Sequence, residues 1–334
     1  MRAPEFWHGP PGLIAGLLAP FGVAFDAVSR LRRAMARPYR APVSVICVGN
    51  IVAGGSGKTP VVLSLAGLLA ARGVATHVVT RGYGGNFVGP ARVDPVLHNA
   101  AQVGDEPLLI AARAPCWVAR DRAAGVRAAI GTGAEAILLD DGFQNPSVAK
   151  DLTFIVLDSG YGFGNGQVIP AGPLRERISA GLIRADAIVL IGDQARPCDI
   201  DAAPGPVLHA EMLPVAGEDF SGTRIVAFAG IGRPEKFFAS LRAAGATLIL
   251  EQPFPDHHAF REREVARLRD IAEREGARLV TTAKDWVRLP PALRNGIEVL
   301  EIEIRWQDPN AVERLLWDCL ARRHDGSDLS AARG

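Results

Sequence analysis

The chain has 334 residues, of which 48% are hydrophobic and 22% are charged, an ordinary composition for a globular protein with room for two domains. Its formal net charge of +1 gives no support to a nucleic-acid partner, because proteins that neutralise many phosphates need a strongly basic surface. The four cysteines are widely spaced and form no CxxC or Cys/His pattern, which is typical of free thiols in a reducing cytosol.

The first 40 residues are basic and partly apolar, unlike the rest of the chain. Six arginines stand there against only Glu5 and Asp26, a local formal charge of +4. Most of these arginines follow a set of apolar side chains: Phe6, Trp7, Leu13, Ile14, Leu17, Leu18, Phe21 and Phe25. We interpret residues 1–35 as a membrane-associating helical region, with the apolar side chains in the acyl boundary and the arginines on anionic headgroups. The alternative is a helix that packs on the protein's own core.

The same region predicts neither a membrane span nor a signal peptide. A spanning helix needs roughly 18 to 20 uninterrupted apolar residues, and the run over 12–25 contains Pro20 and is followed by Asp26. The Ala34-Met35-Ala36 sequence resembles a signal-peptidase cleavage site, but the basic run at 30–33 stands before it. We therefore expect residues 1–35 to remain part of the working protein.

A glycine-rich loop follows the first predicted strand, at 43–48. It reads Gly54-Gly55-Ser56-Gly57-Lys58-Thr59-Pro60 and leads into a helical pattern. Glycines let such a loop turn its backbone N–H groups towards phosphates, and the helix N-terminus adds partial positive charge. Lys58 would then lie on the β- and γ-phosphates of ATP, and the Thr59 hydroxyl would ligate Mg²⁺. The strict pattern G-x-x-x-x-G-K-T requires glycine at position 52, where this chain has valine.

Apolar runs then alternate with helical patterns, which predicts an α/β fold with a mostly parallel sheet covered by helices on both faces. The predicted strands are 77–80, 136–139, 154–157 and 187–191, and the predicted helices include 106–114 and 121–131. We assign residues 36–216 to a P-loop NTPase-like kinase domain. Its last part, 194–217, is rich in Pro, Asp and Ala and predicts a linker.

The pattern restarts after the linker and predicts a second, smaller α/β domain over 217–323. Its expected strands are 224–229, 246–250, 278–282 and 297–304, and its expected helices are 234–244 and 261–276. A final helix at 309–323 could pack on either domain. We expect residues 324–334 to be a disordered tail.

Two adjacent carboxylates end the predicted strand at 136–139. Asp140 and Asp141 have the form of a Walker B motif, in which a carboxylate at the carboxyl end of a buried strand holds Mg²⁺ directly or through water. Alone this pattern is weak, because Asp often ends strands. The glycine-rich loop upstream makes it more specific.

A candidate general base stands in the sequence Gly104-Asp105-Glu106-Pro107, at the start of a predicted helix. Asp is also favoured there as an N-cap, whatever its function. In the functional interpretation, the Asp105 carboxylate accepts the proton of an attacking sugar hydroxyl near the γ-phosphate. The polar cluster Asp256-His257-His258 lies in the second domain, so that a carboxylate and an imidazole could meet across a cleft.

Several arginines follow predicted strands or begin helices. They are Arg81 in the sequence Arg81-Gly82-Tyr83-Gly84-Gly85, Arg120 and Arg122 at the start of a helix in the sequence Arg120-Asp121-Arg122, and Arg175 in the glycine-proline loop at 170–176. Arginine at such a position can clamp an anionic group with two N–H donors. The alternative is a solvated cap. We assign no role from spacing to the polar stretch at 281–285.

Together these motifs resemble the tetraacyldisaccharide 4′-kinase family, which phosphorylates a tetraacylated glucosamine disaccharide 1-phosphate with ATP and gives lipid IVA. The resemblance covers nearly the whole chain and rests on Phe6-Trp7, Gly49-Asn50, 54–60, 81–84, 104–107, 139–144, 170–176, Asp256-His257 and Lys284-Asp285. It also accounts for Val52, because the first glycine of the family's loop stands further upstream, as Gly49 does here. Ala283 departs from the family, where an acidic residue is common.

The resemblance implies roles for individual residues. Asp105 would be the general base with His257 as its partner, and Lys58 would assist catalysis on the phosphates. Residues near Mg²⁺ would be Thr59, Asp140, Asp141 and Glu176, and residues near the substrate or phosphates would be Asn50, Arg81, Tyr83, Arg120, Arg122 and Arg175. The implied partners are the lipid-linked disaccharide and the cytoplasmic face of the inner membrane, to which the enzyme binds peripherally, with no obligate protein partner.

A regulatory P-loop ATPase that cycles on and off membranes is the alternative function. Such proteins carry a similar glycine loop but usually have a lysine before the paired glycines, where this chain has Ala53. A switch of this kind would release free phosphate, whereas a kinase would yield one phosphorylated lipid for each ADP.

Overall fold

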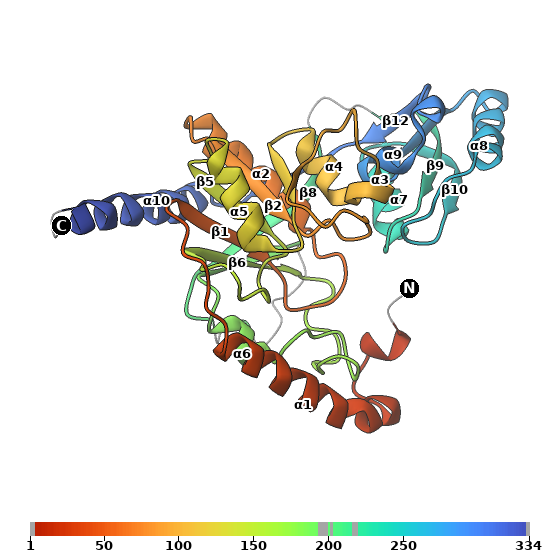
Figure 1. The fold of residues 1–334 in the computed structure, drawn as a ribbon. Helices are drawn as coiled ribbons and strands as arrows, with labels where there is room; N and C mark the ends of the chain where they lie inside the picture. Colours follow the sequence, from red (N-terminus) through yellow and green to blue (C-terminus); the bar gives the residue numbers. More distant parts are fainter. Residues whose placement is uncertain (1–3, 193–199, 201–202, 216–219, 332–334) are drawn as a thin grey trace.

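The fold is described by a computed structural model, which covers residues 4–192, 200, 203–215 and 220–331, with side chains described as far as Arg322. Figure 1 shows a large sheet at the centre of the molecule, a smaller sheet beside it and a long amino-terminal helix set apart from both. The expected α/β class, with a mostly parallel sheet and a smaller second sheet, is confirmed.

The large sheet has nine strands in the order β13-β8-β7-β6-β1-β5-β2-β4-β3. Only the two edge pairs, β13 with β8 and β3 with β4, are antiparallel. The strands are β1 (Ser44–Gly49), β2 (Thr76–Thr80), β3 (Ala91–Arg92), β4 (Cys116–Val118), β5 (Ala136–Asp140), β6 (Leu152–Asp158), β7 (Ala187–Ile191), β8 (Val207–Pro214) and β13 (Ile302–Trp306).

Helices cover both faces of the large sheet, which explains why its inner strands are apolar on both sides. Along β1, Ile46 and Val48 face one hydrophobic core, whereas Val45 and Cys47 face the other. α2 (Lys58–Ala71) and α10 (Pro309–Ala331) pack on the first face, and α5 (Arg122–Gly131) and α6 (Ile178–Leu182) pack on the second. Two short helices, α3 (Ala100–Val103) and α4 (Asp105–Ala111), continue towards the smaller sheet.

The smaller sheet is entirely parallel, in the order β10-β9-β11-β12. Its elements are β9 (Arg224–Ala229), α7 (Pro234–Ala243), β10 (Thr247–Pro253), α8 (Glu262–Arg274), β11 (Arg278–Thr282), α9 (Ala283–Arg288) and β12 (Ile297–Leu300), and short 3-10 turns lie at Glu5–Trp7 and Pro291–Leu293. Phe228, Phe254 and Phe260 contact one another edge to face in one of its two cores.

Two expectations about the carboxyl-terminal half are wrong. The predicted linker contains β8, since Val207–Pro214 extends the large sheet beyond β7. The apolar run at 297–304 was predicted as one strand, but it divides at Glu301, because β12 pairs with the small sheet and β13 with β8. The chain therefore leaves the large sheet after β8, builds the small sheet and returns.

The end of the chain belongs to the large sheet. Val312, Leu316 and Cys319 of α10 are buried in its core, so the final helix packs on the first of the two predicted domains. α10 continues past Arg323, where we expected the helix to end and a disordered tail to begin, and residues 332–334 lie outside the described part. Cys47, Cys116 and Cys319 are free and buried, as expected, and Cys198 lies outside the described residues.

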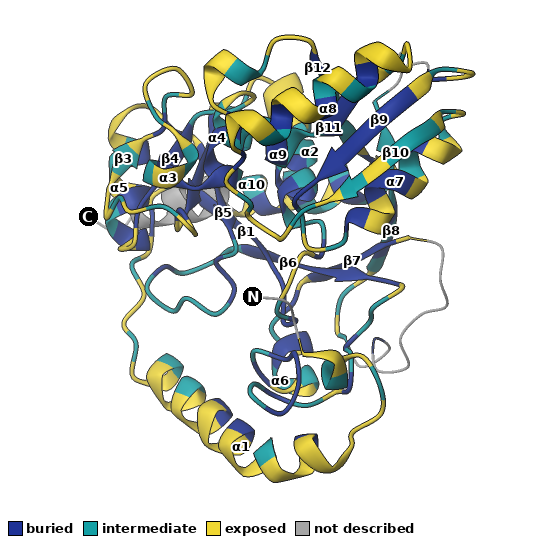
Figure 2. Ribbon diagram, turned by 90° about the vertical axis from the view of Figure 1, so that its right-hand side faces the viewer, coloured by how far each residue is buried: buried dark blue, intermediate teal, exposed yellow. Residues whose placement is uncertain are grey.

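The amino-terminal helix α1 (Leu13–Ala34) contacts the rest of the protein only along a narrow strip. Ala15, Gly22 and Asp26 are its buried residues, and Asp26 forms an ion pair with Arg177 at 3.2 Å. Figure 2 shows most of the helix exposed, and its exposed large apolar residues include Leu13, Leu17, Phe21, Val28 and Leu31. By length and composition α1 could cross a membrane, contrary to our expectation, although core helices and signal sequences meet the same criterion.

Gly104 fixes the position of α4 and therefore of Asp105. Its φ of 93° lies in the left-handed region, and a Cβ atom there would lie 2.4 Å from the backbone oxygen of Tyr83. Only glycine fits this close approach between the loop after β2 and the start of α4.

We predict that Gly104→Ala lowers the free energy of unfolding by about 1–3 kcal/mol, because the new methyl group meets backbone atoms that cannot rotate away. Gly67→Ala is the matched control, since Gly67 is an exposed α2 residue with open space around it. This substitution should raise the free energy of unfolding by about 0.5–1 kcal/mol, because alanine favours the helix. Denaturant unfolding measures both, and a Gly104→Ala protein as stable as the parent would contradict the prediction.

Candidate active site at the carboxyl edge of the large sheet

The glycine-rich loop lies at the carboxyl end of β1 and runs directly into α2, as expected. Gly57 has a φ of 84°, and a Cβ atom there would lie 2.7 Å from Cδ1 of Ile191. The loop is braced from behind, because Ala53 N donates to Pro173 O at 2.7 Å and Arg175 N donates to Ile51 O at 2.7 Å. The backbone therefore presents a fixed turn at the start of a helix, the arrangement that favours anion binding.

Buried polar atoms without a hydrogen-bond partner gather at this edge of the sheet. In the described part of the chain they include Asn50 Nδ2, Ser56 Oγ, Arg122 Nε and Asp140 Oδ1. Leaving such an atom unpaired costs about 1–3 kcal/mol. All four residues follow strands of the large sheet, or begin the loop or helix after one, so this concentration of unmet donors and acceptors indicates a polar ligand.

The two carboxylates after β5 have opposite electrostatic environments. Burial and, after it, the negative charge of Asp141 raise the pKa of Asp140 to about 6. Thr80 Oγ1 donates to one Asp140 oxygen at 3.1 Å. Burial also opposes ionisation of Asp141, but Lys58 at 3.8 Å and Arg175 at 2.8 Å outweigh it and hold the pKa of Asp141 below its usual value.

This donor set fits a magnesium ion that arrives with a nucleotide. The described residues contain no group of three or more His, Cys, Asp or Glu side chains that could hold a metal ion alone. Mg²⁺ at nucleotide sites takes only one or two protein carboxylates and completes its shell with phosphate oxygens and water. Thr59 stands at the start of α2, and Asp140 and Asp141 stand at the carboxyl end of β5, where Asp140 Oδ1 has no partner among the described residues, so the three residues fit such an ion.

Glu176 has a different environment from the other expected metal ligands. Its fully buried carboxylate contacts Arg33 at 3.3 Å and Arg184, and it accepts a hydrogen bond from Gln144 Nε2 at 3.1 Å. Its assignment as a magnesium ligand stays a prediction.

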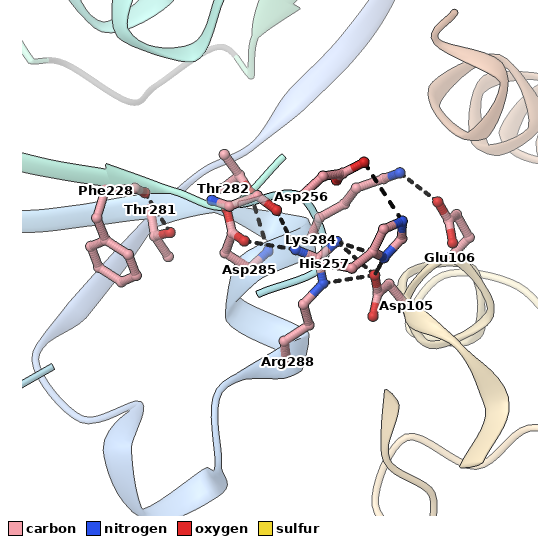
Figure 3. Close-up of polar contacts among 11 residues, drawn as sticks. Asp105, Glu106, Phe228, Asp256, His257, Thr281, Thr282, Lys284, Asp285 and Arg288 are labelled. Carbon is pink, nitrogen blue, oxygen red and sulfur yellow. Dashed lines mark hydrogen bonds and ion pairs between the residues drawn. The ribbon is translucent and has the colours of Figure 1, made fainter. Parts of the chain in front are cut away.

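The predicted carboxylate and imidazole meet where α4 faces the small sheet (Figure 3). His257 Nδ1 lies 2.8 Å from Oδ2 of Asp105. This bond is the first cause of a raised His257 pKa. Burial alone would raise the pKa of Asp105, but hydrogen bonds from His257 and Arg288 outweigh it and hold that pKa below its usual value. At neutral pH the pair is therefore an ionised carboxylate beside an imidazole that is easily protonated.

The sequence did not identify the other charges around this pair. Arg288 donates to Asp105 and to Asp285, and Lys284 forms an ion pair with Glu106 (Figure 3). The only sequence signal was the Lys284-Asp285 stretch after a predicted strand, to which we assigned no role. Two ion pairs, Lys284 with Glu106 and Arg288 with Asp105, therefore join α9 of the small sheet to α4.

A second set of contacts joins the small unit to the glycine-rich loop. Arg233 Nη2 donates to Gly55 O at 2.9 Å and to Asp158 Oδ2 at 2.7 Å. Lys236 donates to the same carboxylate of Asp158 at 2.5 Å. The glycine-rich loop thus lies between two interdomain contacts, one through Asp158 and the other through Asp105.

The residues expected to contact the substrate differ in their exposure and in their contacts. Tyr83 is exposed and its ring centroid lies 6.0 Å from that of His257. Arg122 is buried and donates to Ala119 O, whereas Arg81 and Arg120 are exposed. Arg175 contacts Asp141, as described above. Roles for these side chains and for Asn50 towards substrate stay predictions.

Comparisons with known proteins point to one family. The model of a family described as tetraacyldisaccharide-1-P 4′-kinase matches residues 14–321. A tetraacyldisaccharide 4′-kinase of Rhodospirillum centenum is 52% identical over 332 residues, which cover 97% of this chain and 98% of the relative. The kinase of the same name from Dinoroseobacter shibae is 52% identical over 326 residues, covering 95% of this chain and 97% of the relative.

A solved structure has the same fold. It is the crystal structure of LpxK from Aquifex aeolicus in complex with ATP, which superimposes with a TM-score of 0.75 at 24% sequence identity. The match covers 92% of this chain and all of the other.

We predict that His257 titrates above the ordinary histidine value of about 6.5 and that Asp105→Asn lowers its pKa, because the bond to the carboxylate is the main cause of the shift. Because the pKa of His257 is higher in the folded protein than in the unfolded chain, its protonation stabilises the fold below about pH 6.5. That stabilisation is lost as the pH rises through the pKa of His257 in the folded protein. NMR titration of the imidazole signals measures the change.

His257→Gln would identify the His257 signal. The matched control is His258, whose ring contacts Glu264 at 2.9 Å and not Asp105, so its signal should not respond to Asp105→Asn. An identical His257 midpoint in the parent and in Asp105→Asn would contradict the prediction.

Proposed function

The chain belongs to the tetraacyldisaccharide 4′-kinase family, and on that premise we propose how its residues carry out the reaction. The protein is an ATP-dependent kinase that phosphorylates the 4′-hydroxyl of a tetraacylated glucosamine disaccharide 1-phosphate and gives lipid IVA and ADP. The comparisons give no support to the alternative of a regulatory ATPase. The bond between Asp105 and His257, beside the glycine-rich loop, is the observation on which the proposed mechanism rests.

The glycine-rich loop binds the phosphates of ATP. Backbone N–H groups of 54–59 and the N-terminus of α2 surround the β- and γ-phosphates, and Lys58 neutralises part of their charge. Asn50 and Ser56 have unpaired buried atoms that a bound nucleotide can satisfy, which supports this assignment. Arg122 and Arg175, near Asp140 and Asp141, can pair with phosphate oxygens through planar two-pronged contacts.

Thr59, Asp140 and Asp141 would hold Mg²⁺, which when bound neutralises negative charge on the β- and γ-phosphates. Asp140 supports this assignment because its buried Oδ1 has no partner within the described residues. Burial opposes ionisation of the Asp140 carboxyl group, so a cation beside it would stabilise the ionised form. Lys58 and Arg175 hold Asp141 ionised at the same time.

Asp105 is the general base. A sugar hydroxyl hardly ionises at neutral pH, so a carboxylate must take its proton as the new P–O bond forms. The contacts that Asp105 makes within the described residues all go to its Oδ2 atom, which leaves Oδ1 for the 4′-hydroxyl. His257 holds the carboxylate in place and stabilises its negative charge.

The two halves of this site come from different sheets, and this arrangement would limit hydrolysis of ATP in the absence of the lipid acceptor. Asp105 stands on the large sheet side and His257 on the small one, so the pair is complete only when the two are close. Closure around the substrates excludes water from the γ-phosphate. Arg81, Tyr83 and Arg120 lie on exposed loops nearby and would contact the disaccharide.

The enzyme works at the cytoplasmic face of the inner membrane, where ATP and a lipid substrate are both available. The exposed apolar side chains of α1 would enter the acyl boundary, and Arg30 and Arg32, also exposed, would meet anionic headgroups. The ion pair between Asp26 and Arg177 supports an interfacial position rather than a span, because it fixes α1 against the protein.

The function is tested by incubating the protein with γ-labelled ATP, Mg²⁺ and a lipid disaccharide 1-phosphate, then extracting into organic solvent. Label in the lipid fraction identifies a kinase, whereas label only in free phosphate identifies a regulatory ATPase. Lys58→Ala serves as the negative control because it removes the cation on the phosphates.

We predict that Asp105→Ala lowers kcat by about 10²- to 10⁴-fold, the usual contribution of a general base. The Kd for ATP should change little, because Asp105 does not belong to the phosphate loop. A loss of activity that follows only from a lower melting temperature would instead favour a structural role for Asp105 in the first turn of α4, where Gly104 and not Asp105 is the N-cap.

We also predict that the double variant Leu17→Glu, Phe21→Glu binds vesicles of phosphatidylethanolamine and phosphatidylglycerol more weakly while keeping its affinity for ATP. Both side chains are exposed on α1, so the folded protein should tolerate the change. Val96→Glu is the matched control, because Val96 is equally exposed but lies outside α1. Vesicle flotation measures binding, and unchanged flotation of the double variant would contradict the interfacial role.

A further inference from the structure

Arg288 is a buried cation whose donors all point to the candidate base or to its supports. Its side chain is 5% exposed. Nε and Nη2 lie 2.7 and 2.6 Å from the same Asp105 oxygen, Oδ2. Nη1 donates to Asp285 Oδ1 at 2.9 Å and to Gly230 O at 2.7 Å. A buried guanidinium with this many fixed contacts has a single orientation.

Gly230, the residue after β9, forms hydrogen bonds with both Arg288 and His257. Its N–H donates to Asp285 Oδ2 at 3.0 Å, and its carbonyl accepts from the backbone N–H of His257 at 3.1 Å as well as from Arg288. A Cβ atom there would lie 3.1 Å from an Asp285 oxygen and from Pro255 O. Arg288 and His257 therefore approach Asp105 with fixed relative positions.

The charges that face Asp105 come from three elements (Figure 3). α9 contributes Lys284, Asp285 and Arg288, the loop after β10 contributes Asp256 and His257, and α4 contributes Glu106. Lys284 is paired with Glu106, and Asp285 is fully buried beside Arg288. Arg288 is thus the cation that lies on Asp105 directly, and Asp285 fixes it from behind.

We propose that Arg288, held by Asp285 and Gly230, is a positioning residue that fixes the Asp105 carboxylate, so that Oδ1 faces the acceptor hydroxyl. The inference rests on the proposed role of Asp105 as general base. Two N–H groups on one oxygen leave the other oxygen free and stop the carboxylate from rotating. The same contacts keep the carboxylate ionised until the acceptor arrives.

Arg288→Gln tests this role through the pH dependence of kcat/KM. Without the guanidinium, the contacts with His257 alone oppose the effect of burial, so the pKa of Asp105 rises and the acidic limb of the profile moves to higher pH. We expect kcat at neutral pH to fall about 10- to 100-fold, as for a misplaced catalytic group, with the KM for ATP nearly unchanged. Arg288→Lys restores the charge and should return the acidic limb towards its original position.

Arg294→Gln is the matched control. Arg294 also lies close to α9 and donates to backbone oxygens of Leu289 and Val287, but it does not contact Asp105 or His257. We expect it to change stability and leave the pH profile in place. If Arg288→Gln prevents folding, Arg288→Met, which fills a similar volume without N–H donors, should move the acidic limb in the same direction.

An unshifted acidic limb in Arg288→Gln, or in Arg288→Met where the first variant does not fold, would overturn the inference and leave Arg288 with a structural role only. Failure of the proposed function is a separate result: Asp105→Ala would then retain near-normal turnover, whatever the Arg288 variants do.

Discussion

The parallel pairing of β1 with β5 and β6 is the constraint from which the site follows. Val48 is paired with Asp140, so β1 and β5 end at nearly the same height, whereas β6 continues beyond Ile155, the partner of Gly49, to Asp158. β1 can lie there only because its side chains are apolar on both faces and each face is covered by helices. The phosphate loop and the two carboxylates then meet at one edge of the sheet without any further adjustment.

The features that could be predicted from the sequence are those encoded by neighbouring residues. The glycine-rich loop, the paired carboxylates and most strands have local patterns, and their positions are confirmed. β8 was missed because Pro, Asp and Ala around it are typical of a linker, and because a strand that is only half buried lacks a continuous apolar run. The division at Glu301 was missed because both halves are apolar and only the two partner sheets distinguish them.

The polar residues of the candidate site also divide into those that the sequence predicts and those that it does not. Asp105 and His257 were identifiable from motifs, whereas Arg288 and Gly230 were not, because a buried arginine or a packed glycine has no local signature. Their contacts depend on how α9 and β9 are brought together, which is a property of the small sheet as a whole. Local sequence therefore identifies the proposed base and its partner better than it identifies the buried residues that contact them.

The loop at 170–177 connects α1 with the phosphate loop. At one end Arg177 binds Asp26 of α1, and a Cβ atom on Gly22 would lie 2.7 Å from the nearby Val168 oxygen. At the other end Pro173 and Leu174 pair with Ala53 and Val52, in front of the glycines. If α1 lies in the headgroup layer, this loop sets the distance between the bilayer surface and the γ-phosphate of bound ATP. The sugar of a lipid acceptor must span that distance, so the choice of acceptor would depend on the size of its headgroup as well as on the chemistry of its hydroxyl groups.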